Sequence, residues 1–98
     1  MTPTPTPREQ AVAEVARLVA FLADLPPQGV VPELSELGGH LERAVRAFHM
    51  EAIRFRAYTM SRLIKLHAAE LPADVPVLME SITKALDAAG FQTRSVSA

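Results

Sequence analysis

The chain has 98 residues, a formal net charge of −1 and no cysteine, which excludes disulfides, thiolate metal sites and cysteine nucleophiles. Hydrophobic residues make up 49% of the sequence but aromatic residues only 5%, so we expect an aliphatic core and an all-α fold. The small net charge gives no general attraction to nucleic acid or anionic lipid, and the chain is interpreted as one cytoplasmic domain without a membrane-spanning segment.

Residues 1–6 alternate Thr and Pro, which predicts a disordered, extended tail. A helix start follows directly. Thr6 can cap the helix, Pro7 suits the first helical position, and Glu9 can return a hydrogen bond to the cap. The predicted helix covers residues 7–25 and ends at the Pro-Pro-Gln-Gly sequence that follows it.

A connector leads from this helix to the centre of the chain. Pro32 can open a short helical turn over residues 32–37. Gly38 and Gly39 follow, and two adjacent glycines cost a helix about 2 kcal/mol relative to alanine. We therefore predict a break or hinge at the two glycines.

A long central helix is predicted over residues 40–71, because residues 40–70 contain neither Gly nor Pro and Pro72 follows. On a helical projection its apolar residues span an arc of about 200°, where a helix with one buried side needs about 100°. The helices of one short chain cannot cover such an arc. The sequence therefore predicts a three-helix unit, residues 7–91, that assembles as a symmetric homodimer or higher oligomer.

The last helix is predicted over residues 75–89, with Asp74 as its cap. Gly90 and Phe91 are typical of a glycine C-terminal cap whose hydrophobic residue folds back on the last turn. Residues 92–98 are expected to form a flexible tail.

Three polar residues inside the wide apolar arc, Glu42, His49 and Arg56, follow one another at intervals of seven, the repeat of a helix–helix seam. In an antiparallel pair with its two-fold axis at His49, Glu42 would face Arg56 of the other chain. The alternative is that these side chains lie at the edge of the arc and reach water. The residues expected to mediate self-association are Glu42, Val45, Phe48, His49, Ala52, Ile53, Arg56, Met60 and Ile64.

A basic face is predicted on the opposite side of the long helix, formed by Arg43, Arg54, Arg62 and Lys65. Residues 40–67 carry six Arg or Lys against two Glu, a local net charge of +4. Such a face is either solvated or binds an anionic partner, an acidic protein or a nucleic acid. Nucleic acid is the less favoured partner, because no binding motif accompanies the cations.

No motif for catalysis, for a cofactor or for a metal is found in the sequence. His49 and His67 lie 18 residues apart, about 27 Å along a straight helix, so they cannot share one ion within it. Two alternatives involve the His49 residues of two chains. They could share a metal ion, or they could form a pH-sensitive contact, since imidazole gains its proton between about pH 7 and 5.5.

The sequence therefore indicates a non-enzymatic, oligomerising interaction, assembly or adaptor module. Its expected partner is a second copy of itself or another protein, with no membrane and no cofactor involved. The alternative is a small regulatory protein that binds an anionic partner through its basic face.

Overall fold

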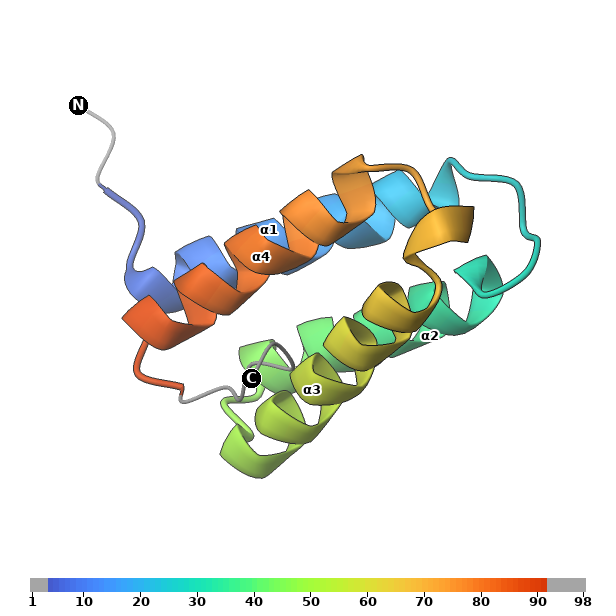
Figure 1. The fold of residues 1–98 in the computed structure, drawn as a ribbon. Coiled ribbons are helices and arrows are strands. Elements are labelled where there is room, and N and C mark those ends of the chain that lie inside the picture. Colours follow the sequence, from blue (N-terminus) through green and yellow to red (C-terminus); the bar gives the residue numbers. More distant parts are fainter. Residues whose placement is uncertain (1–3, 92–98) are drawn as a thin grey trace.

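The computed structural model describes residues 4–91, which form an all-helical, up-and-down bundle. Its elements are α1 (Pro7–Ala23), α2 (Val31–Arg46), α3 (Met50–Leu66), the short 3₁₀ turn η1 (Ala68–Glu70) and α4 (Asp74–Ala88). Figure 1 shows α1 beside α4 in one layer and α2 beside α3 in the other. The α3–α4 packing is the least extensive of the four neighbouring pairs. Most of the two predicted tails, residues 1–3 and 92–98, lies outside the described residues.

The start of α1 confirms the predicted capping box. The backbone N–H of Glu9 donates to Oγ1 of Thr6 at 3.2 Å, and the backbone N–H of Thr6 donates to Oε1 of Glu9 at 3.0 Å. Two donors that the first helical turn leaves without helical partners are thereby satisfied. Pro7 needs no such partner, because proline has no N–H.

The capping box also makes the stability of α1 depend on pH. The hydrogen bonds from Thr6 lower the pKa of Glu9 below its usual 4.5, because they favour the carboxylate. A lowered pKa adds stability above the usual value, and that contribution is lost as the pH falls through the lowered one. We expect Glu9→Gln to reduce the fall in unfolding free energy between about pH 6 and pH 3, measured by urea titration.

The control for this experiment is Glu33→Gln, which removes another exposed carboxylate from the first turn of a helix, here α2. Glu33 makes no hydrogen bond or ion pair within residues 4–91. An equal loss of pH dependence in both variants would show that the capping box is not its source.

The predicted break at Gly38-Gly39 is wrong, because both glycines lie inside α2. Gly38 is buried at the contact with α1. A Cβ atom placed on Gly38 would lie 2.9 Å from Cγ2 of Val19, whereas one on Gly39 would meet no atom within 4 Å. Gly38 therefore lets two helices approach closely, and that packing offsets the low helix propensity of the pair.

The predicted long helix over residues 40–71 is also wrong, because the chain turns back at residues 47–49, here called the 47–49 turn. Phe48 has a φ of 59°, the left-handed region that few residues other than glycine adopt. The N–H of Phe48 donates to the carbonyl of Val45 at 3.1 Å, and the N–H of His49 to that of Ala44 at 3.0 Å. These bonds form a Schellman motif that ends α2.

Tertiary contacts accompany this turn. The ring of Phe48 lies 5.1 Å from the ring of Phe91, and the guanidinium of Arg8 lies 5.2 Å from the same Phe48 ring. Both partners are far from Phe48 in the sequence. Contacts with residues distant in the sequence therefore stabilise the turn, and no local sequence pattern around residue 48 predicts them.

The end of α4 confirms the predicted glycine cap. Gly90 has a φ of 91°, and the N–H of Phe91 donates to the carbonyl of Leu86 at 2.9 Å while its side chain is fully buried. The start of α4 differs from the prediction. Asp74 is the first helical residue, and Ala73 occupies the cap position without a side-chain hydrogen bond.

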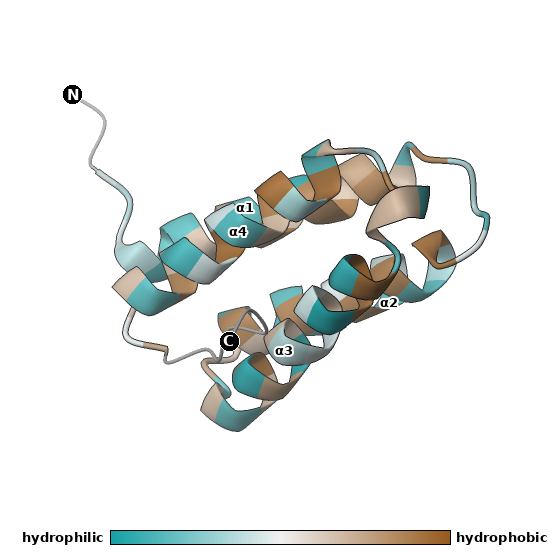
Figure 2. Cartoon of the chain, in the orientation of Figure 1, coloured by the Kyte–Doolittle hydropathy of each residue, from teal (hydrophilic) through white to brown (hydrophobic). Residues whose placement is uncertain are grey.

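One aliphatic core fills the space between the two layers. Each helix contributes one buried stripe, and Figure 2 shows hydrophobic and hydrophilic residues sharing the circumference of every helix. The stripes are Ala11, Val15, Leu18 and Leu22 on α1; Leu34, Leu41, Ala44 and Val45 on α2; Ile53, Ala57, Met60 and Ile64 on α3; and Val75, Met79, Ile82 and Leu86 on α4. The over-wide arc predicted for one helix is thus divided between α2 and α3, which face the same core.

Candidate interaction surface

Most large apolar residues of the predicted self-association set lie in the core of this chain. The exposed fraction is 0% for Val45, Ile53 and Met60 and 3% for Ile64. Ala52 is half-buried and also packs against the core. The four buried residues are covered by the chain's own helices and offer no open surface to a second copy, and Ala52 is only partly accessible.

The polar members of that set are separated by the 47–49 turn. Glu42 lies on α2, where one Oε2 atom accepts hydrogen bonds from Arg46 at 3.0 and 3.2 Å. Arg56 lies on α3 with its guanidinium 5.5 Å from the ring of Phe55. His49 is exposed in the turn itself. The predicted seam required one continuous helix, so it does not form as a row on this chain.

Three of the four predicted basic-face residues lie together. Arg54, Arg62 and Lys65 are exposed, and helical geometry puts them within about 80° of one another on α3. Within residues 4–91 none of the three makes an ion pair or hydrogen bond. Arg43 lies apart on α2, 3.4 Å from Nδ1 of His40. The predicted face is therefore reduced to three cations on one helix.

Large apolar side chains share this side of α3. The exposed fractions are 61% for Phe55, 39% for Tyr58 and 68% for Leu66. The helical projection of the predicted long helix counted Phe55 and Leu66 in its apolar arc of about 200°, because it ran straight through the 47–49 turn. We call the combined surface the α3 outer face; it consists of Arg54, Phe55, Tyr58, Arg62, Lys65 and Leu66.

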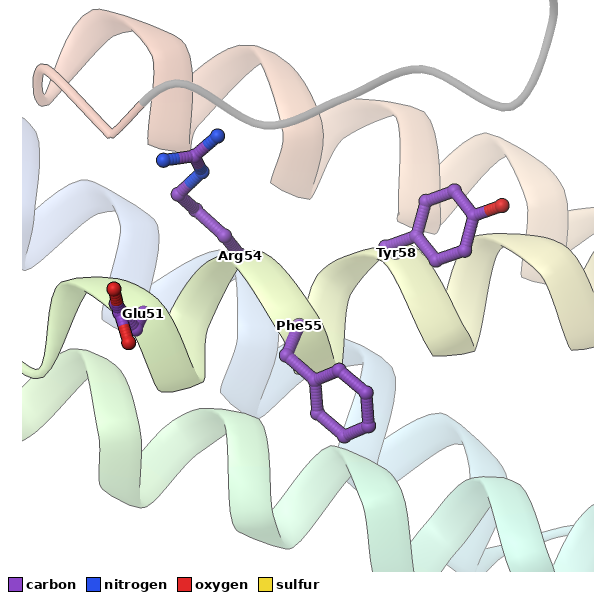
Figure 3. Close-up of a pocket in the computed structure, with 4 residues that line it drawn as sticks. All are labelled: Glu51, Arg54, Phe55 and Tyr58. Atoms are coloured by element: carbon purple, nitrogen blue, oxygen red, sulfur yellow. The ribbon is translucent and has the colours of Figure 1, made fainter.

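A shallow hollow of about 450 Å³ lies on the α3 outer face. Its described lining consists of Glu51, Arg54, Phe55 and Tyr58, all from α3. Figure 3 shows Arg54 and Phe55 leaving opposite edges of the helix, with Tyr58 one turn further along. The hollow is therefore lined by two aromatic side chains and by the guanidinium of Arg54, which makes no hydrogen bond or ion pair within residues 4–91.

The charge of α3 distinguishes it from the rest of the bundle. It carries Arg54, Arg56, Arg62 and Lys65 against Glu51, a net charge of +3, although the whole chain has −1. The α3 outer face is therefore a local positive region on a weakly acidic protein, which attracts anionic surfaces over about one Debye length, roughly 8–10 Å.

The buried carboxylate of Glu14 belongs to a local arrangement on α1. Its Oε1 accepts a hydrogen bond from Gln10 at 2.9 Å, and its Oε2 lies 3.6 Å from Nη1 of Arg17 without a hydrogen bond. Both partners are within one turn of Glu14. The group is a partly satisfied ion pair of one helix, and the contacts described for it include no nucleophile or second acid.

Two further site types were sought in residues 4–91. No three His, Asp or Glu side chains there are grouped so that they could hold a metal ion. Within the same residues, no helix has both the length and the apolar composition needed to cross a bilayer. Comparison with models of protein families, with curated proteins and with solved structures finds no match to this chain. Among the described residues, the α3 outer face combines exposed aromatic and aliphatic side chains with three cations that make no ion pair or hydrogen bond there.

Proposed function

We propose that this chain is a non-catalytic interaction module that docks the α3 outer face on an acidic surface of another protein. The observation that carries the proposal is the coincidence of exposed Phe55 and Leu66 with three cations that have no partner within residues 4–91. Exposed apolar residues rimmed by charges are typical of protein-binding surfaces. Burying a side chain of this size contributes about 1.5–3 kcal/mol.

The charge pattern supports a foreign acidic protein over two other partners. Two α3 outer faces pressed together would oppose Arg62 and Lys65 to cations of the same kind, which disfavours symmetric docking through this face. Nucleic acid is bound by more strongly basic domains, whereas here α3 alone among the four described helices carries a net positive charge.

The test uses a photo-crosslinking amino acid in place of Tyr58, with the tagged chain expressed in its native host. We expect protein adducts that decrease at least about fivefold on Arg62→Glu, because a charge contact at a docking surface is reversed. Raising the salt concentration during crosslinking should decrease them too, because the exposed cations are then screened.

The matched control is Lys84→Glu, which reverses one exposed cation on α4, where Lys84 pairs with Glu80 at 3.4 Å. Lys84→Glu changes the net charge as much as Arg62→Glu but lies off the α3 outer face. Adducts lost equally in both variants, or in neither, contradict the proposal. Adducts that disappear on nuclease treatment would assign the face to nucleic acid instead.

A further inference from the structure

The 47–49 turn joins two helices by a short connection that has no glycine. Its central residue, Phe48, holds a left-handed conformation that is unfavourable for an L-residue with a Cβ atom. No Gly or Pro occurs in residues 40–71 to oppose a helix there. The local sequence therefore favours a straight helix through residue 48, and the turn persists through its Schellman bonds and the Phe48–Phe91 ring contact.

Rotation of Phe48 into the right-handed region, together with His49, whose ψ of 90° is also non-helical, would join α2 and α3 into one helix over residues 31–66. At 1.5 Å per residue such a helix is about 54 Å long, whereas the longest dimension of the bundle is 40 Å. The α3–α4 half would then leave the α1–α2 half. Both halves would expose buried stripes that the complementary halves of a second copy can cover.

We propose that the chain forms a domain-swapped dimer by this opening, in which each α3–α4 half packs on the α1–α2 half of a second copy. The α1–α4 and α2–α3 contacts of the monomer would all be remade between the chains, so the exchange sacrifices no core packing. Domain swapping is a low-cost route to a dimer for that reason. This proposal uses the core and the turn, and it does not depend on the α3 outer face.

The self-complementary pattern around residue 49 fits this assembly. A hairpin that turns at residue 48 and two antiparallel helices that cross near it bring nearly the same positions opposite each other. In the monomer Glu42 bonds to Arg46 and Arg56 lies against Phe55, so the hairpin packs α2 on α3 without the predicted Glu42–Arg56 pair. The swapped dimer would remake the same α2–α3 packing between two chains. The second copy is thus the occupant that these surfaces already fit.

The first test compares Phe48→Gly with Phe48→Ala. Both variants lose the ring contact with Phe91, so they differ only in backbone preference. Glycine tolerates the left-handed turn and weakens a straight helix, and alanine does the reverse. Because a swapped dimer contains two such positions, we expect the dimer association constant of Phe48→Ala to exceed that of Phe48→Gly by at least about a hundredfold. Both association constants are measured by analytical sedimentation after the variants have been refolded at high concentration.

The second test distinguishes a swap from docking of closed monomers. The natural chain has no cysteine, and Ala20 of α1 and Val77 of α4 line one groove of about 560 Å³. Chains carrying only Ala20→Cys are refolded together with chains carrying only Val77→Cys, and a short bis-maleimide is added. A swapped dimer places the two thiols in one groove and gives a covalent dimer of one chain of each kind.

Three outcomes would overturn the swap. These are equal association constants for Phe48→Gly and Phe48→Ala, dimers that give no mixed crosslink, and variants that stay monomeric at every concentration. None of them affects the docking proposed for the α3 outer face, whose test uses an adduct at position 58. Failure of one proposal is therefore distinguishable from failure of the other.

Discussion

Replacing Met60 by alanine is expected to lower the free energy of unfolding by about 2–5 kcal/mol, because its fully buried side chain would leave a cavity in the core. The sequence assigned Met60 to a surface shared with a second copy, whereas the structure buries it among α1–α4 of one chain. The loss should therefore be present in the monomer and measurable by urea denaturation at low protein concentration.

The control for Met60→Ala is Leu66→Ala on the same helix. The exposed fraction of Leu66 is 68%, so its truncation should change the unfolding free energy by no more than about 0.5 kcal/mol. A loss for Met60→Ala that appears only at concentrations where the protein is oligomeric would place Met60 in an interface, contrary to this structure.

The substitution Gly38→Val is expected to reduce the unfolding free energy by about 1–3 kcal/mol, because α1 and α2 must move apart to accommodate the larger side chain. The Cβ alone would lie 2.9 Å from Cγ2 of Val19, and the stiff, branched side chain of Val19 cannot easily rotate away. Thermal and urea unfolding would both report the loss.

A substitution at the neighbouring Gly39 is expected to raise the unfolding free energy. A Cβ there meets no atom within 4 Å, so Gly39→Ala should raise stability by about 0.5–1 kcal/mol through helix propensity alone. If both substitutions destabilise the protein equally, the two glycines mark a flexible hinge, as their sequence first indicated, and the close approach of α1 and α2 is not the reason for Gly38.

Local sequence signals placed two helix ends accurately. The Thr6–Glu9 capping box and the Gly90–Phe91 cap are each complete within a few residues, so the bonds that form them can be foreseen without a tertiary structure. The fold class also followed from composition. What these signals share is that both hydrogen-bonding partners are close in the sequence.

The turn at Phe48 could not be foreseen in this way. Phe48 has no local preference for a left-handed backbone, and its ring contact with Phe91 joins the middle of the folding unit to its C-terminal end. The prediction at Gly38 failed for a related reason. A glycine that breaks a helix and a glycine that lets two helices pack closely look the same in the sequence. Only the position of Val19 distinguishes the two.

The missed turn affected some predictions about the candidate site and left others unchanged. Arg54, Arg62 and Lys65 were grouped correctly, because their spacing depends only on the periodicity of α3. Phe55 and Leu66 were assigned to the apolar arc, because one helical projection was carried across the 47–49 turn, where α3 starts with a new phase. Relative directions within one helix were therefore reliable, and directions carried across its end were not.

The contact between Phe48 and Phe91 sets an order of events during synthesis. Translation proceeds from the N-terminus, so α1, α2 and α3 have all been synthesised before Phe91 exists to pack against Phe48. A nascent chain consequently lacks this ring contact at the 47–49 turn until α4 is complete. The 47–49 turn therefore has all of its stabilising contacts only after Phe91, which follows α4, has been synthesised and can pack against Phe48.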